Sequence, residues 1–163
     1  EDTMLMSYVL DAGKNRHNMD TLSKIHLNHS PIAYKDIVGV VTIGYGHTGS
    51  DVAEGQTVTE EEAEEILRKD LTKFEDYVKN YVECELNQEQ FDALVAWTFN
   101  LGPGNLKSST LLKRLNENDY DDVPNQIRRW NRAGGEVVSG LVRRRNSEAH
   151  LFEHGELKYE FDD

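Results

Sequence analysis

A short run of β-branched residues bracketed by glycines, residues 40–43, constrains the fold more than any other part of the chain. Gly39 precedes this run, and Gly44 and Gly46 follow it. β-Branched residues favour strands, whereas glycine is favoured where the backbone turns or approaches another group closely. The pattern therefore predicts a strand in a small hairpin.

Three polar residues lie at the edges of this predicted hairpin: Asp36, Thr42 and His47. They place a carboxylate, a hydroxyl and an imidazole within a dozen residues, on what we expect to be two adjacent strands. Such a hairpin would hold the three groups close enough to form the floor of a cleft. The alternative is an ordinary hairpin whose polar residues face water.

The length and the charge of the chain exclude several classes of protein. A chain of 163 residues suits a single domain with a core of its own. We expect no membrane span, because no apolar run approaches the length that a bilayer requires. The net charge of −12 argues against nucleic acid, whose phosphates need basic partners. The acidic surface serves solubility or contacts a basic protein partner.

Two features bear on the cellular setting. The chain opens with Glu1 and not with methionine, so removal of an upstream targeting segment, anchor or second domain is an open alternative. A single cysteine, Cys84, excludes an internal disulfide. Its neighbours Glu83 and Glu85 should raise the pKa of the thiol, which makes Cys84 a poor nucleophile.

Helical signals follow the hairpin. Thr59 and Glu62 have the spacing of a capping box, and the apolar residues after them recur at helical spacing as far as Tyr81. Asn87 is predicted to cap a second helix, which 102–104 should end. The remaining predicted boundaries are helix starts at Ser109, at Asp121 or Asp122 and at Ser139, and a turn at 133–135.

The hairpin sequence from Tyr34 to His47 reads Tyr-x-Asp-x-x-Gly-x-x-Thr-Ile-Gly-x-Gly-His. It resembles the signature of the phage-type lysozymes, or endolysins, of glycoside hydrolase family 24. Later motifs have the order and spacing that this family shows: 90–94, 99–100, 109–112, 129–130, 133–135 and 140–145. The resemblance extends from about residue 20 to about residue 155.

The resemblance implies an α+β fold with two lobes. A small lobe with a hairpin or a three-stranded sheet would be joined by a long helix to a mostly helical lobe. The implied parts of this single lysozyme-like domain are an N-terminal helix, the small lobe, the bridging helix, the helical lobe and an acidic tail, at about 1–20, 21–60, 61–82, 83–155 and 156–163.

The resemblance also implies hydrolysis of the β-1,4 bond between N-acetylmuramic acid and N-acetylglucosamine in peptidoglycan, with no cofactor and no metal. Asp36 matches the base that activates the attacking water, and Thr42 matches the hydroxyl that orients this water. The implied substrate-binding residues are Tyr34, Phe99 and Asn100. The implied structural residues near the site are His47, Gly44 and Gly46.

One catalytic group of that family is missing. The family has a glutamic acid nine residues before the motif aspartate, and Leu27 occupies this position here. No glutamate occurs anywhere in 3–53. Leucine cannot donate a proton, and a general acid contributes about 10²–10⁴-fold to a rate, so we expect little hydrolysis. His26 or His29 could substitute, because an imidazolium has a suitable pKa, but neither occupies the family's position.

Two interpretations follow. The first is a muramidase whose acid was replaced, which Asp36 and Thr42 favour because an unused pair has no reason to keep a catalytic spacing. The second is a non-catalytic module that binds glycan or a protein partner, which Asn28, Ser30 and Pro31 favour because the acid-bearing turn has changed. We expect a monomer at the bacterial cell wall or in the periplasm, whether phage-encoded, secreted or delivered. Its expected partners are peptidoglycan glycan strands or, under the second interpretation, a basic protein.

Overall fold

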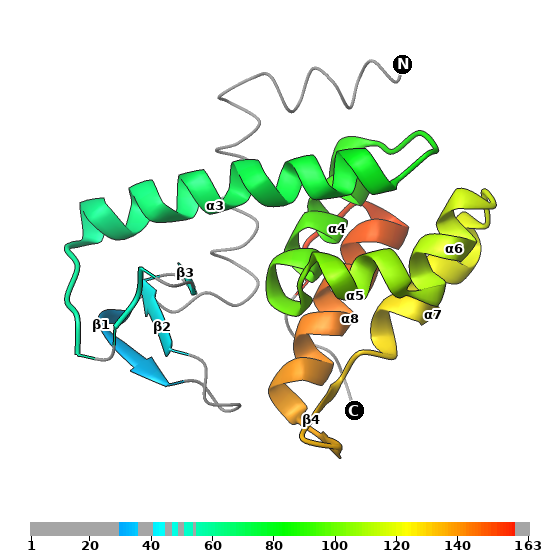
Figure 1. The fold of residues 1–163 in the computed structure, drawn as a ribbon. Coiled ribbons are helices and arrows are strands. Elements are labelled where there is room, and N and C mark those ends of the chain that lie inside the picture. The colour runs from blue at the N-terminus through cyan, green and yellow to red at the C-terminus, as the bar shows by residue number, and fades with distance from the viewer. Residues whose placement is uncertain (1–29, 36–40, 45–46, 49–50, 54, 159–163) are drawn as a thin grey trace.

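The computed structural model describes residues 30–35, 41–44, 47–48, 51–53 and 55–158. Figure 1 shows a small sheet beside one end of a long helix and a cluster of helices at the other end of the same helix. The predicted two-part, α+β architecture is therefore confirmed. The N-terminal helix expected at about 1–20 lies outside the described residues, and the numerical boundaries between the five parts of the chain stay a prediction.

The sheet has three antiparallel strands in the order β1-β2-β3. They are β1 (Ser30–Lys35), β2 (Val41–Gly44) and β3 (His47–Thr48). Tyr34 pairs with Thr42 across the first two strands, and Ile43 pairs with His47 across the second two. The predicted hairpin strand is confirmed as β2. Thr42 and His47 lie on adjacent strands, as expected, whereas Asp36 lies outside the described residues.

A capping box begins the long helix α3 (Glu60–Tyr81), as the sequence predicted. The backbone N–H of Glu62 donates to Thr59 Oγ1 over 3.1 Å, and the backbone N–H of Thr59 donates to Glu62 Oε1 over 3.0 Å. Two of the amide groups that a helix start leaves unpaired are thereby satisfied. The hydrogen bond from the Thr59 backbone also lowers the pKa of the Glu62 carboxyl.

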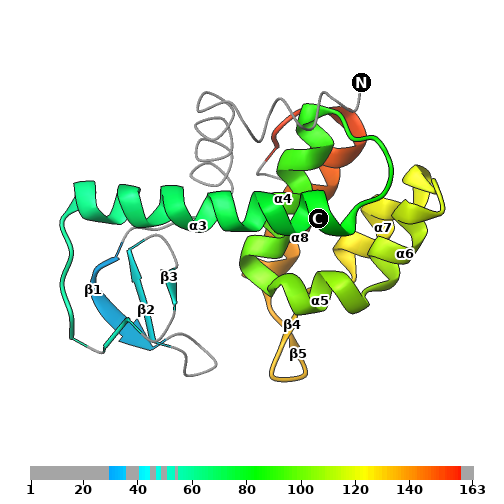
Figure 2. The same ribbon diagram turned by 45° about the horizontal axis from the view of Figure 1, so that its top comes forward.

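Helix α3 joins the two parts of the molecule. It packs against β2 and β3, and it also packs against α4 (Gln88–Leu101) and α5 (Pro103–Ser108). Figure 2 shows the sheet under one end of α3 and the other helices around its opposite end. One face of the helix is buried at a spacing of three or four residues: Ala63, Leu67, Leu71, Glu75 and Val78. This periodicity lets one amphipathic helix serve both parts.

The helical part is built around α4, which is buried along most of its length. Asn87 caps α4 in a second capping box with Gln90, so this prediction is confirmed. The remaining elements are α6 (Thr110–Asn116), the 3₁₀ helix η1 (Tyr120–Asp122), α7 (Val123–Arg128) and α8 (Ser139–His154). Helix α8 packs against both α4 and α7, and the hydrophobic core lies between them.

The helix boundaries between α4 and α8 agree in part with those predicted from the sequence. Helix α4 ends at Leu101, as predicted, but the segment 102–104 that was predicted to end it also starts α5. Proline is well suited to a first helical turn, because its missing N–H would have no partner there. The predicted helix starts at Ser109 and at Asp122 are confirmed. The side chain of Ser109 accepts from the backbone N–H of Leu112, whereas the side chain of Asp122 makes no capping hydrogen bond. The turn at 133–135 is confirmed as well, and the structure adds that it joins two short strands, β4 (Arg132–Ala133) and β5 (Glu136–Val137).

The capping box of α3 gives a test of the fold. Thr59→Ala removes the oxygen that accepts from Glu62, so the free energy of unfolding should fall by about 1 kcal/mol. Thr59→Ser keeps this oxygen and should lose much less. Urea denaturation followed by circular dichroism measures both variants. Equal losses in alanine and serine variants would mean that packing of the threonine methyl group, and not the cap, provides the stability.

Candidate functional site

The predicted site residues of the small sheet are placed by strand register. Tyr34 and Thr42 are paired positions on β1 and β2, and Gly44 pairs with Ser30 on the same two strands. His47 lies on β3 opposite Ile43. The other predicted positions lie outside the described residues: His26, Leu27, His29, Asp36 and Gly46. The structure thus brings Tyr34 and Thr42 side by side along the backbone.

The two predicted substrate-binding residues of the helical part lie in the last turn of α4. Phe99 is half-buried, and its ring contacts Phe74 of α3 edge to face, with ring centroids 5.2 Å apart. Offset and edge-to-face contacts of this kind stabilise aromatic pairs beyond their area burial. Phe99 therefore lies where α4 meets α3, and Asn100 follows it in the same turn.

A row of aromatic rings continues from Phe99 along α3. Phe74 contacts Tyr77 at 5.6 Å between centroids, and Tyr77 stacks on Tyr81 at 6.3 Å. The ammonium group of Lys107 on α5 lies 5.9 Å from the centre of the Tyr81 ring, within cation–π distance. Sequence reasoning missed this row, although its spacing of three and four residues on one helix was the available signal.

Asn100 is held from the core of the helical part, which the sequence did not reveal. Arg145 of α8 donates from Nη2 to Asn100 Oδ1 over 2.9 Å. Arg145 is fully buried and forms an ion pair with Glu148, which is fully buried too. Its Nη1 donates to the backbone oxygen of Trp130 over 3.4 Å. The arginine run 143–145 of α8 thus contributes a buried ion pair through Arg145.

The Arg145–Glu148 pair has two contacts of different quality. Arg145 Nη2 donates a hydrogen bond to Glu148 Oε2 over 3.0 Å. Arg145 Nε lies closer, 2.8 Å from Oε1, but neither of these two atoms has hydrogen-bond alignment. The closer contact is thus a charge contact. Burial raises the pKa of Glu148 to about 7, and the adjacent positive charge of Arg145 opposes this rise.

Two tryptophans of the helical part contact each other. Trp97 is fully buried on α4, and its ring meets that of Trp130 edge to face with centroids 5.3 Å apart. The indole N–H of Trp97 has no hydrogen-bond partner within the described part of the chain.

The remaining sequence predictions concern a thiol and metal ions. The pKa of Cys84 is raised, as predicted, but burial is the main cause and Glu83 is a minor one. Within the described ranges, no group of three or more His, Cys, Asp or Glu side chains could hold a metal ion. No helix among the described residues is long and apolar enough to cross a bilayer.

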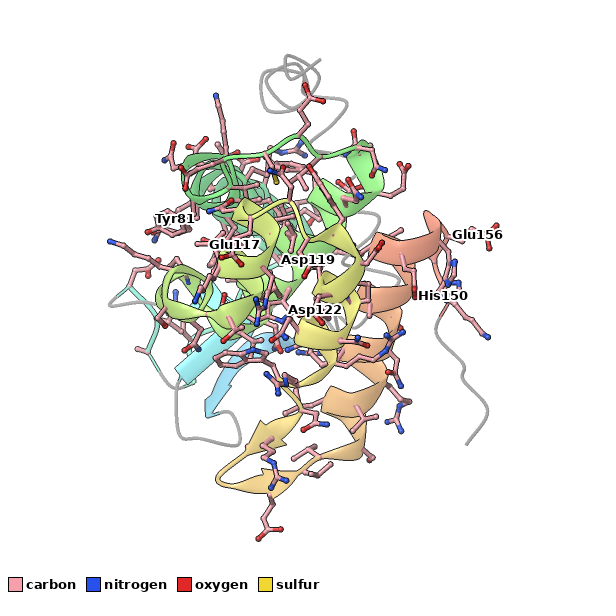
Figure 3. All side chains as sticks on the ribbon, turned by 90° about the vertical axis from the view of Figure 1, so that its right-hand side faces the viewer. Tyr81, Glu117, Asp119, Asp122, His150 and Glu156 are labelled. Atoms are coloured by element: carbon pink, nitrogen blue, oxygen red, sulfur yellow. The ribbon has the colours of Figure 1, made fainter. Side chains whose placement is uncertain are left out.

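Figure 3 shows acidic side chains on the outer surface of the helical part. Glu117, Asp119 and Asp122 lie on or beside α6 and η1, and Arg114 contacts two of these carboxylates at 3.5 and 3.6 Å. Such exposed ion pairs contribute little to stability. The acidic surface is thus partly compensated in this region.

The buried pair makes stability depend on pH. Glu148 has a pKa of about 7 in the folded chain and an ordinary value of 4.5, so the folded state binds more protons between these values. The contribution of Glu148 to the free energy of unfolding is therefore fully present below pH 4.5 and is lost as the pH rises through 7. The change should be on the order of 3 kcal/mol.

The matched control is Glu148→Gln, which keeps an oxygen for Arg145 and cannot titrate. The stability of the unaltered chain relative to this variant should decrease between pH 4.5 and pH 8, as measured by urea denaturation at a series of pH values. Parallel profiles for both chains would show that Glu148 does not change its protonation state in this interval.

Comparison with known proteins identifies the family of the chain. The family model described as phage lysozyme matches residues 28–148. An endolysin of Bacillus phage B103 is 49% identical over 117 residues, which are 72% of this chain and 44% of that protein. A SAR-endolysin of Bacteriophage PS119 is 41% identical over 115 residues, which are 71% of this chain and 69% of that protein.

A solved structure gives the same result for the fold. The muramidase domain of SpmX from Asticaccaulis excentricus superposes with a TM-score of 0.75 at 34% sequence identity, covering 85% of this chain and 95% of that one. The chain spans less than half of the Bacillus phage B103 endolysin, so it is similar to one part of that protein. Because the family model matches well over half of the sequence, the chain belongs to the phage lysozyme family, as its hairpin motif indicated.

Proposed function

We propose that the chain binds peptidoglycan glycan strands at a muramidase-type site whose hydrolytic activity is strongly impaired. The observation that carries this proposal is the family match over 28–148, which includes Asp36 and Thr42. Leu27 lies just outside that matched range, and we assign it to the position of the family's acid because it precedes Asp36 by nine residues. Peptidoglycan hydrolysis is the activity of the family, and the bacterial cell wall is the place where phage endolysins act.

The proposed chemistry assigns one role to each group. Asp36 would act as the base for an attacking water, and Thr42 would orient this water. Thr42 is paired with Tyr34 across β1 and β2, and Asp36 follows Tyr34 by two positions in the sequence. Glycosidases of this kind need a second carboxyl group that protonates the leaving oxygen. Leu27 offers no proton, so bond cleavage would lack its acid.

A second candidate function is a non-catalytic module that binds glycan or a protein partner. It is favoured by the absence of any glutamate in 3–53, which leaves no nearby carboxylic acid of that type to replace the missing one. The net charge of −12 would suit a basic partner. Under this alternative Asp36 and Thr42 would contribute to binding or to the hairpin, and not to a reaction.

The test is release of muropeptides from purified peptidoglycan by the unaltered chain and by Leu27→Glu. Restoring the acid should raise the rate by about 10²–10⁴-fold. The matched control is Leu27→Gln, which has nearly the same shape as glutamate but no titratable proton, and which should stay as slow as the unaltered chain. Removing the proposed base in the double variant Leu27→Glu with Asp36→Asn should abolish the gain.

The other outcomes separate the interpretations. Full activity of the unaltered chain would contradict the assignment of the acid position and would direct attention to His26 and His29. No activity in any variant, with folding intact and with binding to insoluble peptidoglycan retained, would favour the non-catalytic module. Loss of both activity and binding would contradict the proposed glycan site.

A further inference from the structure

The end of α8 carries two histidines one helical turn apart. His150 and His154 are separated by four positions, and both belong to the helix, which ends at His154. Side chains at this spacing lie on the same face of a helix. Their rings meet with centroids 4.6 Å apart and with planes inclined by 50°. The helix itself therefore brings the two imidazoles together.

The hydrophobic core holds the backbone between these two histidines. Leu151 and Phe152 are each 4% exposed and belong to the core of the helical part. Gly155 ends the helix in the left-handed conformation, and its backbone N–H donates to the Leu151 oxygen over 2.9 Å. The His154 side chain is 53% exposed, and His150 is partly buried. The histidines are thus accessible from solvent on a turn whose position the core fixes.

This geometry suits a metal ion shared by the two rings. Residues 150–154 read His-x-x-Glu-His, an order that one class of zinc enzymes uses with both histidines as ligands. A motif this short also occurs by chance, so the distance between the rings is the stronger observation. Two imidazoles bound to one tetrahedral zinc ion at about 2.0–2.1 Å have centroids about 5 Å apart. The observed 4.6 Å therefore requires only a small rotation of the side chains.

The charged groups near the histidine pair include two carboxylates. Glu153 Oε1 lies 3.4 Å from His154 Nε2, and Figure 3 shows His150 and Glu156 on the same outer side of the helical part. Burial, followed by the positive charges of His154 and Lys158, lowers the pKa of His150, and the two glutamates oppose this decrease. A lowered pKa keeps an imidazole neutral, which is the form that binds a metal ion.

We propose that His150 and His154 together bind one divalent transition-metal ion of the zinc or copper class. The site does not depend on the proposed glycan site. Among the residues that the structure describes, no group of three or more such side chains could hold a metal, so the pair supplies two ligands and water completes the coordination. Imidazole suits zinc, copper and nickel, whereas magnesium and calcium prefer oxygen ligands. The bound ion would therefore be exchangeable, unlike the ion of a closed structural site.

The test is isothermal titration calorimetry of the full chain with zinc chloride and, separately, with copper chloride, at neutral pH in a buffer that does not bind metals. The unaltered chain should bind one ion of either metal at this pair, copper more tightly than zinc, and magnesium chloride should give no binding. His150→Gln and His154→Gln should each weaken binding about a hundredfold, because the second ligand binds from an already tethered position.

Two controls separate this site from general effects. His17→Gln makes the same substitution at another histidine of the chain, and it should leave the affinity for zinc unchanged. Thermal unfolding followed by circular dichroism checks that each variant folds. It also gives a second readout, because an ion that binds only the folded chain raises the unfolding midpoint. Zinc should raise this midpoint for the unaltered chain and for His17→Gln, and much less for His150→Gln or His154→Gln.

Each outcome decides for or against the site. Absence of zinc and copper binding by the unaltered chain, or full affinity in either His150→Gln or His154→Gln, would overturn it. An equal loss in His17→Gln would overturn it as well, because the binding would then not belong to the pair. One ion shared by two chains, detected by sedimentation, would overturn a site on a single chain. Loss of metal binding in the two α8 variants alone, with binding to insoluble peptidoglycan unchanged, would support it.

Discussion

The ion pair between Arg145 and Glu148 is the interaction on which the arrangement of the helical part depends. Burying two charges is costly unless they are paired and hydrogen-bonded, and here both side chains are fully enclosed. The guanidinium group meets that requirement by contacting three elements: α8 itself, the end of α4 through Asn100, and the segment after α7 through Trp130. The packing of these three elements is thereby fixed by one side chain.

This arrangement joins the candidate site to the core. Asn100 lies at a helix end and not on a loop, and its amide is held by a side chain 45 positions later in the chain. Sites whose contacting groups are supported by buried neighbours keep their geometry better than sites on free loops. The proposed hydrolytic groups of the hairpin belong to the other part of the molecule. A ligand that contacts both parts would therefore meet Asn100, which the core of the helical part supports, and hairpin groups that this core does not support.

Much of the fold could be predicted because it depends on neighbours in sequence. The boxes at Thr59 and Asn87 satisfy their own helix starts, so the relevant partners lie only three residues away. The start of α5 was missed because Pro103 both ends one helix and begins another, and only the packing decides between these roles. The partner of Asn100 was out of reach for the same reason: which of three consecutive arginines is buried depends on how α8 packs. The hairpin pattern drew attention to Asp36, Thr42 and His47, but their proposed chemical roles come from the family resemblance, because no local rule identifies them.

Helix α3 also has a thermodynamic consequence. The sheet that it supports has strands of six, four and two residues, which is close to the lower limit for a sheet in water. The same helix completes the hydrophobic core of the helical part through Leu67, Leu71 and Val78. Neither part can therefore melt without removing a surface on which the other packs. We therefore expect the two parts to unfold as one cooperative unit, in which the larger core stabilises the small sheet through α3.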